Sequence, residues 1–196
     1  MKTIYLAGGC FWGVQKFFDQ FDGVLSTETG YANGPAARMA ADERSAQSGA
    51  DDRSAQSGTD DTAGAVPHAP TYEDVCHDSG HAETVRVDYD ENVISLAQLL
   101  DYYFMVIDPV AVNRQAHDVG IQYRTGIYYT GEDQLPAIRD VFSREQAKAG
   151  RPLAVEVLPL AEFYPAEEYH QKYLDKNPGG YCHIPAVYFS LKNSAD

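Results

Sequence analysis

Apolar residues near the N-terminus follow first a strand pattern and then a helix pattern. Residues 3–7 (TIYLA) form a short apolar run that predicts a buried strand, and a Gly-Gly turn follows it. Four apolar residues then recur at helical spacing, namely Phe11, Val14, Phe18 and Phe21. This spacing predicts a helix over 10–21 with Cys10 at its start. Residues 24–31 (VLSTETGY) predict a second strand, so the chain opens with a strand-helix-strand unit.

The second half of the chain alternates strand and helix patterns. The patterns predict strands over 84–89, 126–130 and 153–158, and helices over 96–107, from 135 to Gly150, and around 166–176. Ser95 and Gln98 have the spacing of a capping box, which sets the start of the first of these helices. Strands interleaved with helices predict an α+β fold, a ferredoxin-like two-layer sandwich with helices packed on one mixed β-sheet. We expect a single domain over 1–196.

Between these ordered-looking parts lies a polar insertion at about 34–67. Within it, residues 43–51 (ERSAQSGAD) nearly repeat as residues 52–60 (DRSAQSGTD). The repeated unit has no aliphatic residue larger than alanine to bury, and two copies are too few for a solenoid. The sequence therefore predicts a flexible surface insertion of low complexity.

Charge and hydropathy narrow the classes of partner. The formal net charge is −14 and the sequence pI is near 4.7, so the chain would repel a phosphate backbone and we expect no nucleic acid partner. No apolar run approaches membrane-spanning length, and the short apolar N-terminus runs directly into Gly8 and Gly9. We expect a cytoplasmic, monomeric protein without membrane contact.

The three cysteines supply the candidate chemistry. Cys10, Cys76 and Cys182 are an odd number spread over the whole chain, which does not fit a secreted disulfide framework. At a helix start the backbone N–H groups favour a thiolate, so we expect a lowered pKa for Cys10. Phe11 and Trp12 beside it are suited to wall a pocket for a small apolar group such as methyl. These residues alone leave open whether Cys10 is catalytic or a small core residue between packed aromatics.

Five separated runs occur in a fixed order outside the insertion. They are GCFWG (9–13), PTYEDVC (70–76), GHAE (80–83), NRQ followed by DVGIQYR (113–124), and NPGGYC (177–182). In these runs the chain resembles the A-type peptide methionine sulfoxide reductases, and the resemblance covers nearly all of the chain outside the insertion. The insertion itself is a departure, because it lengthens a connection that is usually brief.

The resemblance implies a role for each matching side chain. Cys10 attacks the sulfoxide sulfur, which releases methionine and leaves a sulfenic acid on the enzyme. Loss of the oxygen needs a proton, and Glu83 matches the family's acid. Tyr72 and Tyr123 match two phenols that hydrogen-bond the oxygen, and Asp118 matches a further carboxylate of the site. For Glu83 to arrive protonated, a partly apolar pocket must raise its pKa.

A second thiol is needed to reset the enzyme. A sulfenic acid condenses readily with a thiol, and Cys182 lies in a Gly-rich segment, so we expect it to resolve Cys10 as a Cys10–Cys182 disulfide. The resemblance names thioredoxin as the reductant, and no cysteine follows Cys182 to relay the disulfide outward. Cys76 is interpreted as a buried structural thiol. The expected function is reduction of the S-epimer of methionine sulfoxide, free or in proteins, as repair of oxidative damage, without a metal or organic cofactor.

Two other classes of protein are compatible with parts of the pattern. A cysteine peroxidase also uses a reactive thiol, a sulfenic acid and a resolving thiol, but it has no need of an apolar methyl pocket with a protonated acid. A metal-binding module would draw on five side chains, namely Cys76, His77, His81, Cys182 and His183. Structural zinc sites usually bring ligands in close pairs such as Cys-x-x-Cys, which this chain lacks.

Overall fold

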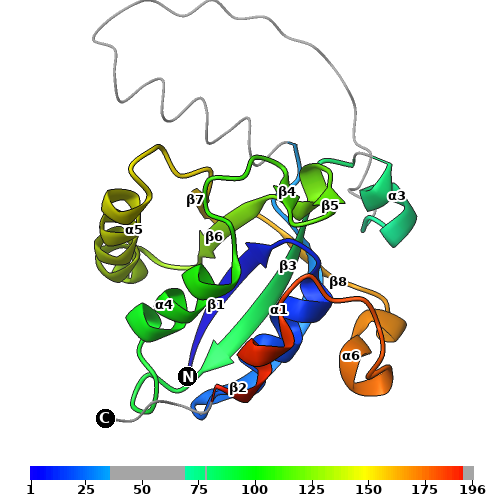
Figure 1. The fold of residues 1–196 in the computed structure, drawn as a ribbon, viewed down its shortest axis with the longest axis horizontal. Helices are drawn as coiled ribbons and strands as arrows, with labels where there is room; N and C mark the ends of the chain where they lie inside the picture. Colours follow the sequence, from blue (N-terminus) through cyan, green and yellow to red (C-terminus); the bar gives the residue numbers. More distant parts are fainter. Residues whose placement is uncertain (36–68, 78, 192–196) are drawn as a thin grey trace, which may run out of the picture.

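A computed structural model describes residues 1–35, 69–77 and 79–191. Its strands are β1 (Lys2–Gly8), β2 (Val24–Ala32), β3 (Ala82–Tyr89), β4 (Arg114–Gln115), β5 (Asp118–Val119), β6 (Thr125–Tyr129), β7 (Glu156–Pro159) and β8 (Phe163–Pro165). Its helices are α1 (Phe11–Phe18), α3 (Tyr72–Cys76), α4 (Leu96–Val106), α5 (Leu135–Ala149) and α6 (Tyr173–Lys176) (Figure 1). The predicted insertion at about 34–67 lies outside the described residues, except for Gly34 and Pro35.

One six-stranded sheet organises the described chain. Its strand order is β7-β6-β1-β3-β2-β8, and only the pair β6–β7 is parallel. The four inner strands are connected as β1-α1-β2 and β3-α4-β6, which is the ferredoxin-like arrangement, and β7 and β8 extend the sheet at its edges. The predicted α+β fold with helices on a mixed sheet is therefore confirmed.

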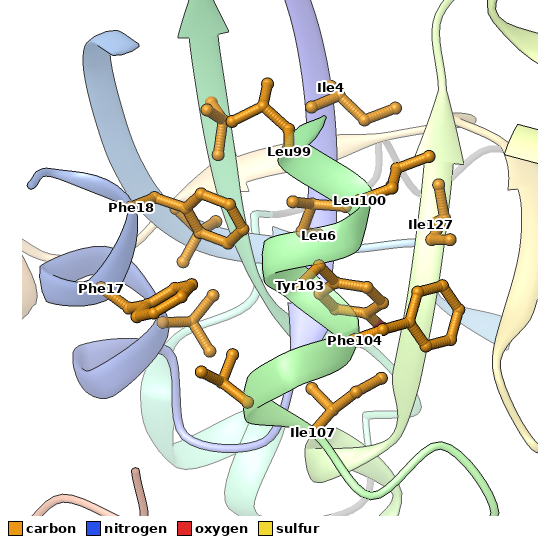
Figure 2. Packing of buried hydrophobic residues seen from close by; sticks show 14 of the residues in the cluster. Ile4, Leu6, Phe17, Phe18, Leu99, Leu100, Tyr103, Phe104, Ile107 and Ile127 are labelled. Carbon is orange, nitrogen blue, oxygen red and sulfur yellow. The ribbon is translucent and has the colours of Figure 1, made fainter. Parts of the chain in front are cut away.

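The main hydrophobic core lies between this sheet and the helices α1 and α4. Figure 2 shows side chains of β1 and β6 meeting those of the two helices, among them Ile4, Leu6, Phe17, Phe18, Leu99, Leu100, Tyr103 and Ile127. Ile4 and Leu6 alternate with Tyr5 and Ala7; Ala7 belongs to a smaller cluster of buried side chains, and the half-buried Tyr5 packs against that cluster. The buried Tyr103 hydroxyl donates to the backbone carbonyl of Ala7 at 2.7 Å, so α4 fixes the end of β1 that leads into Cys10.

Helix ends follow local chemistry where the sequence supplies a clear cap. Ser95 Oγ accepts a hydrogen bond from the backbone N–H of Gln98, and the Gln98 side chain accepts one from the backbone N–H of Ser95. Helix α5 ends at Gly150, whose φ of +66° is left-handed and favours glycine. The predicted capping box and the predicted end at Gly150 are confirmed.

Two predicted helices are wrong in extent because tertiary contacts override the apolar spacing. Helix α1 ends at Phe18 rather than Phe21, and its next residue Asp19 is held by the ammonium of Lys172. The helix expected around 166–176 is broken at Lys172, which has a φ of +52° and donates its backbone N–H to the Gln15 side chain at 2.7 Å. Only a 3₁₀ turn (Glu168–His170) and the single turn α6 remain.

Three short elements were not predicted, and each carries part of the candidate site. Helix α3 begins with Tyr72, the hairpin β4–β5 carries Asp118, and strand β8 leads into Glu167. Strand β7 also begins later than the predicted 153–158. No helix in the described part of the chain is long and apolar enough to cross a membrane.

Candidate active site

Cys10 stands at the junction of β1 and α1, as the residue that caps the helix N-terminus. Its side chain is buried, with 7% of the residue exposed. Burial and then the Glu83 carboxylate raise the pKa of the Cys10 thiol far above its usual value, and the backbone N–H of Trp12 offsets this only in part. The lowered pKa expected from the helix start is therefore wrong for the free protein, because desolvation outweighs the helix N-terminus.

Glu83 is the second residue of β3, and its side chain lies next to the start of α1. Its Oε2 accepts a hydrogen bond from the backbone N–H of Phe11 at 3.0 Å, and only 1% of the residue is exposed. Burial raises the pKa of Glu83 to about 8, the Phe11 N–H opposes the shift, and Asp118 adds to it. A group with this pKa is mostly protonated at neutral pH, so the raised pKa that the sequence analysis expected is present.

Two phenols face the same carboxyl group. Tyr72 is the first residue of α3, and Tyr123 ends a 3₁₀ turn, Ile121–Tyr123. Burial and then Glu83 raise the pKa of both hydroxyls, and Cys10 adds to the shift of Tyr123. Both phenols are thus hydrogen-bond donors at neutral pH, and the structure brings them together with Glu83 and Cys10.

The indole of Trp12 forms a fixed apolar wall next to Cys10. Its ring stacks on Tyr173 with a centroid distance of 3.7 Å and an interplanar angle of 15°. Its Nε1–H donates to His170 Nδ1 at 3.0 Å, which requires the proton of a neutral His170 to sit on Nε2. The His170 ring lies 5.1 Å from the Phe11 ring, 5.6 Å from the Trp12 ring and 4.5 Å from the Tyr72 ring, so these three aromatic side chains pack around one imidazole.

Asp118 and Cys182 complete the group that the sequence singled out. Asp118 contributes to the raised pKa values of both Cys10 and Glu83, so its carboxylate lies near them. Cys182 Sγ lies only 2.8 Å from the point where a Cβ on Gly13 would stand, so it occupies the space that glycine leaves on the first turns of α1. Figure 1 shows the C-terminal segment running beside α1. The structure therefore gathers all eight candidate residues around one helix N-terminus.

Comparisons with known proteins agree with this arrangement. A sequence model of the family described as "Peptide methionine sulfoxide reductase" matches residues 2–50 and 54–194. The chain belongs to this family. Peptide methionine sulfoxide reductase MsrA of Clostridium acetobutylicum is 50% identical over 186 residues, which cover 94% of this chain and 96% of the relative. MsrA of Lachnoclostridium phytofermentans is 47% identical over 195 residues, covering 98% of this chain and 99% of the relative.

Solved structures of the same family share the fold. Reduced Mxr1 of Saccharomyces cerevisiae superposes with a TM-score of 0.75 at 33% identity, covering 94% of this chain and 91% of Mxr1. Methionine sulfoxide reductase A of Corynebacterium diphtheriae gives a TM-score of 0.70 at 31% identity, covering 94% of this chain and 82% of that one. A further structure holds Mxr1 in complex with Trx2. This chain is a methionine sulfoxide reductase of the A type.

Sequence reasoning missed two residues that hold the reductase's site together. Glu167 accepts hydrogen bonds from the backbone N–H of Tyr72 at 2.9 Å and from the Tyr31 hydroxyl at 2.7 Å, and His170 holds Trp12. Both fall in the segment that the pattern assigned to a helix around 166–176, and nothing in that pattern singled them out. Only their pairing with Tyr72 and Trp12, far away in sequence, reveals their place.

Arg124 ties the loops around the reductase's site to one another. Its buried guanidinium donates to three backbone carbonyls, those of Gly80 (3.1 Å), Ile121 (3.1 Å) and Asn33 (2.7 Å), and also to the Glu156 carboxylate at 3.0 Å. Burying a guanidinium requires such a full set of acceptors. Arg124 thereby fixes the neighbouring Tyr123 relative to the start of β3.

Cys76 departs from its interpretation as a buried structural thiol. It is exposed, at the end of α3, and it hydrogen-bonds with the Tyr72 side chain. The helix α3 was not predicted, and it turns Val75 inward instead of Cys76. Among the described residues, no group of three or more His, Cys, Asp or Glu side chains is placed to hold a metal ion, so the metal-binding alternative has no supporting site there.

Proposed function

We propose that the chain reduces the S-epimer of methionine sulfoxide, free or within proteins, by transferring its oxygen to Cys10. The observation that carries this proposal is the pairing of a buried thiol with a buried acid whose pKa is raised to about 8. The S-epimer follows from the A type of the family. Repair of oxidised proteins is the corresponding role.

Binding uses the apolar and polar sides of the site separately. The substrate methyl group packs against Phe11 and the Trp12 indole, which Tyr173 and His170 hold in place. The sulfoxide oxygen accepts hydrogen bonds from Glu83, Tyr72 and Tyr123, which carry protons at neutral pH. The substrate sulfur then faces Cys10.

The first chemical step moves one oxygen atom between two sulfur atoms. The Cys10 sulfur attacks the sulfoxide sulfur, and Glu83 donates its proton to the sulfoxide oxygen. The oxygen then bonds to the Cys10 sulfur while the S–O bond of the substrate and the transient S–S bond break, and the remaining electron pair stays on the methionine sulfur. The products are methionine and a Cys10 sulfenic acid, so the substrate sulfur is reduced by two electrons and the Cys10 sulfur is oxidised by two. Glu83 regains a proton from the Cys10 thiol or from solvent.

The second step returns Cys10 to a state that a dithiol protein can reduce. The Cys182 sulfur attacks the sulfenic sulfur, a Cys10–Cys182 disulfide forms, and the hydroxyl group leaves as water with the proton of Cys182. A thioredoxin then reduces the disulfide by exchange. Two facts support this partner. The yeast relative is known in complex with Trx2, and Cys182 lines an open cleft of about 530 Å³ beside Leu174 and Phe189.

The decisive experiment separates the two half-reactions. Reduced protein is mixed with each sulfoxide epimer, first without reductant and then with thioredoxin, thioredoxin reductase and NADPH. Cys10→Ser should release no methionine. Cys182→Ser should release about one methionine per chain without reductant and should fail to cycle with thioredoxin, as sulfenic acid chemistry requires. Cys76→Ser is the matched control and should cycle as the unmodified chain does, because the serine hydroxyl can keep the hydrogen bond with Tyr72.

Three results would contradict the proposal. Full cycling by Cys10→Ser would remove Cys10 as the nucleophile. Preference for the R-epimer would overturn the assigned specificity. Peroxide turnover that exceeds sulfoxide turnover would favour the peroxidase alternative.

A further inference from the structure

His183 is a buried titratable side chain that the mechanism above does not use. It follows Cys182 directly, and its side chain is 3% exposed. Neither ring nitrogen forms a well-aligned hydrogen bond within the described part of the chain. Burial lowers the pKa of His183, while Asp118 and a hydrogen bond with the Gly8 backbone raise it. A buried imidazole whose hydrogen bonds are poorly aligned is unfavourable, so its position calls for an explanation.

The ring of His183 lies between the Cys10 turn and Asp118. On one side, His183 Nε2 lies 3.1 Å from the point where a Cβ on Gly9 would stand. Gly9 has a φ of +83°, so this turn favours glycine on conformational grounds as well. On the other side, His183 Nδ1 faces Asp118 Oδ2 at 3.9 Å, and neither of these two buried atoms forms a well-aligned hydrogen bond within the described residues.

The residue before Cys182 reaches the same carboxylate. A hydrogen bond from the Tyr181 hydroxyl to Asp118 adds to burial in raising the pKa of Tyr181. Asp118 is thus approached by both residues that flank Cys182, one on each side. Between them, Cys182 Sγ lies over Gly13 on the first turns of α1.

We propose that Asp118, Tyr181 and His183 form a clamp that positions Cys182 for disulfide formation. This inference rests on the proposed function, because it explains how Cys182 is placed for the second step. Asp118 on β5 is the fixed end of this Cys182 clamp, and Tyr181 and His183 are positioning residues. A closing movement of about 1 Å brings His183 Nδ1 within hydrogen-bond distance of Asp118 and satisfies both atoms.

The clamped step is a condensation that depends on the approach of two sulfur atoms. The Cys182 S–H bond and the Cys10 S–O bond break, the S–S bond forms, and the proton and hydroxide combine as water. The Cys182 sulfur is oxidised and the sulfenic sulfur is reduced, so no outside reductant enters. Because misplacing reacting atoms by about 1 Å can slow a step on the order of 100-fold, a loose Cys182 segment should slow this step alone.

The test compares His183→Leu, which fills the space without a donor, with His183→Asn, whose side-chain amide can stand at the Nδ1 position. Each reduced protein is mixed with excess methionine sulfoxide without reductant, and methionine and free thiols are counted after acid quenching over time. His183→Leu should release methionine and lose its first thiol, that of Cys10, at the unmodified rate, but it should lose the second thiol, that of Cys182, about ten- to 100-fold more slowly. His183→Asn should restore most of the thiol loss. Tyr181→Phe, which removes only a hydroxyl from a residue that is 47% exposed, should slow thiol loss several-fold.

The control is His77→Asn, an exposed histidine outside the clamp, which should match the unmodified chain in both readouts. Loss of the second thiol, that of Cys182, at the unmodified rate in His183→Leu would overturn the clamp. So would equal slowing of methionine release and thiol loss, because that would place His183 in the first step. Failure of the unmodified chain to release methionine or to form the disulfide would instead overturn the proposed function.

Discussion

The Glu83 carboxyl group lies next to the first turn of α1 and accepts a hydrogen bond from the backbone N–H of Phe11 at 3.0 Å. A helix N-terminus normally favours a negative charge, which would lower the pKa of a carboxyl group. Burial has the larger effect here and raises the pKa of Glu83 to about 8. The Phe11 N–H can donate to the carboxyl group whether Glu83 is protonated or ionised. This hydrogen bond therefore orients the acid without forcing it to ionise.

This balance makes a prediction for stability. Between its ordinary pKa of 4.5 and the folded value of about 8, Glu83 holds its proton in the folded chain but loses it in the unfolded chain. The folded state then binds more protons, so the free energy of unfolding falls as pH rises, by about 1 to 2 kcal/mol per pH unit for one group. Glu83→Gln carries no such penalty and should exceed the unmodified chain in stability by a few kcal/mol at pH 8, and by much less at pH 5.

Urea unfolding at pH 5, 6.5 and 8 measures the difference. Glu132→Gln, at an exposed carboxylate, serves as the control. Its free energy of unfolding should differ from that of the unmodified chain by the same amount at each pH. A gap between Glu83→Gln and the unmodified chain that stays constant with pH would contradict a raised folded pKa.

The same group predicts the pH dependence of the chemical step. Above pH 8 Glu83 loses the proton that the departing oxygen needs, so the single-turnover rate of methionine release should decline there. Glu83→Gln should be slower at neutral pH by roughly 100- to 10,000-fold, the usual effect of losing a general acid, and should lack the alkaline decline. If the rate of methionine release declined equally above pH 8 in both proteins, a group other than Glu83 would cause the decline.

Cys10 gives a prediction about reactivity in the free protein. Cys10 is buried and its pKa is raised by burial and by Glu83, whereas Cys76 is exposed. Iodoacetamide at pH 7 should therefore label Cys76 before Cys10, and labelling of Cys10 should accelerate with rising pH because only the thiolate reacts. Peptide mass spectrometry over time measures the order. Early labelling of Cys10 at pH 7 would restore the low pKa first expected from the helix start.

Much of the fold could be predicted because local chemistry and the final structure agree. The alternation of Ile4 and Leu6, the capping box of Ser95 and Gln98, and the terminal Gly150 each act within a few residues. The break at Lys172 could not be predicted in the same way. Its backbone N–H bonds to the Gln15 side chain, 157 positions away in sequence, and such a contact leaves no periodic signal.

In the candidate site, too, some features could be predicted from local sequence and others depend on contacts between distant segments. Cys10, Glu83, Tyr72, Tyr123 and Cys182 stand in runs that resemble a family, so the sequence could name them together. The burial that raises the pKa of Cys10 depends on how the chain packs around the helix start. The contacts that hold Tyr72 and Trp12 there come from Glu167 and His170, which the sequence did not single out. A thiol at a helix N-terminus is therefore insufficient to predict the sign of its pKa shift.

Gly13 allows a direct test of how closely Cys182 packs on α1. A Cβ at this position would stand 2.8 Å from Cys182 Sγ, so Gly13→Ala must displace the thiol. The alanine should stabilise the helix by up to about 1 kcal/mol from propensity alone, yet slow disulfide formation after a normal burst of methionine. Gly179→Ala is the matched control, since a Cβ there meets nothing within 4 Å. Equal rates of loss of the second thiol, that of Cys182, in the two variants would show that Cys182 does not need this space.

His170 predicts how the Trp12 wall contributes to substrate binding. His170→Phe keeps an aromatic ring among Phe11, Tyr72 and Trp12 but removes the acceptor of the indole N–H, which then has no partner and can tilt. We expect the KM for methionine sulfoxide to rise about tenfold, a loss equal to one hydrogen bond of about 1.4 kcal/mol, with a smaller change in kcat. His170→Asn, whose side-chain oxygen can stand at the Nδ1 position, should recover part of the loss. Because burial lowers the pKa of His170, the effect should not vary between pH 7 and 8, and a KM unchanged in His170→Phe would show that Tyr173 stacking alone holds the indole.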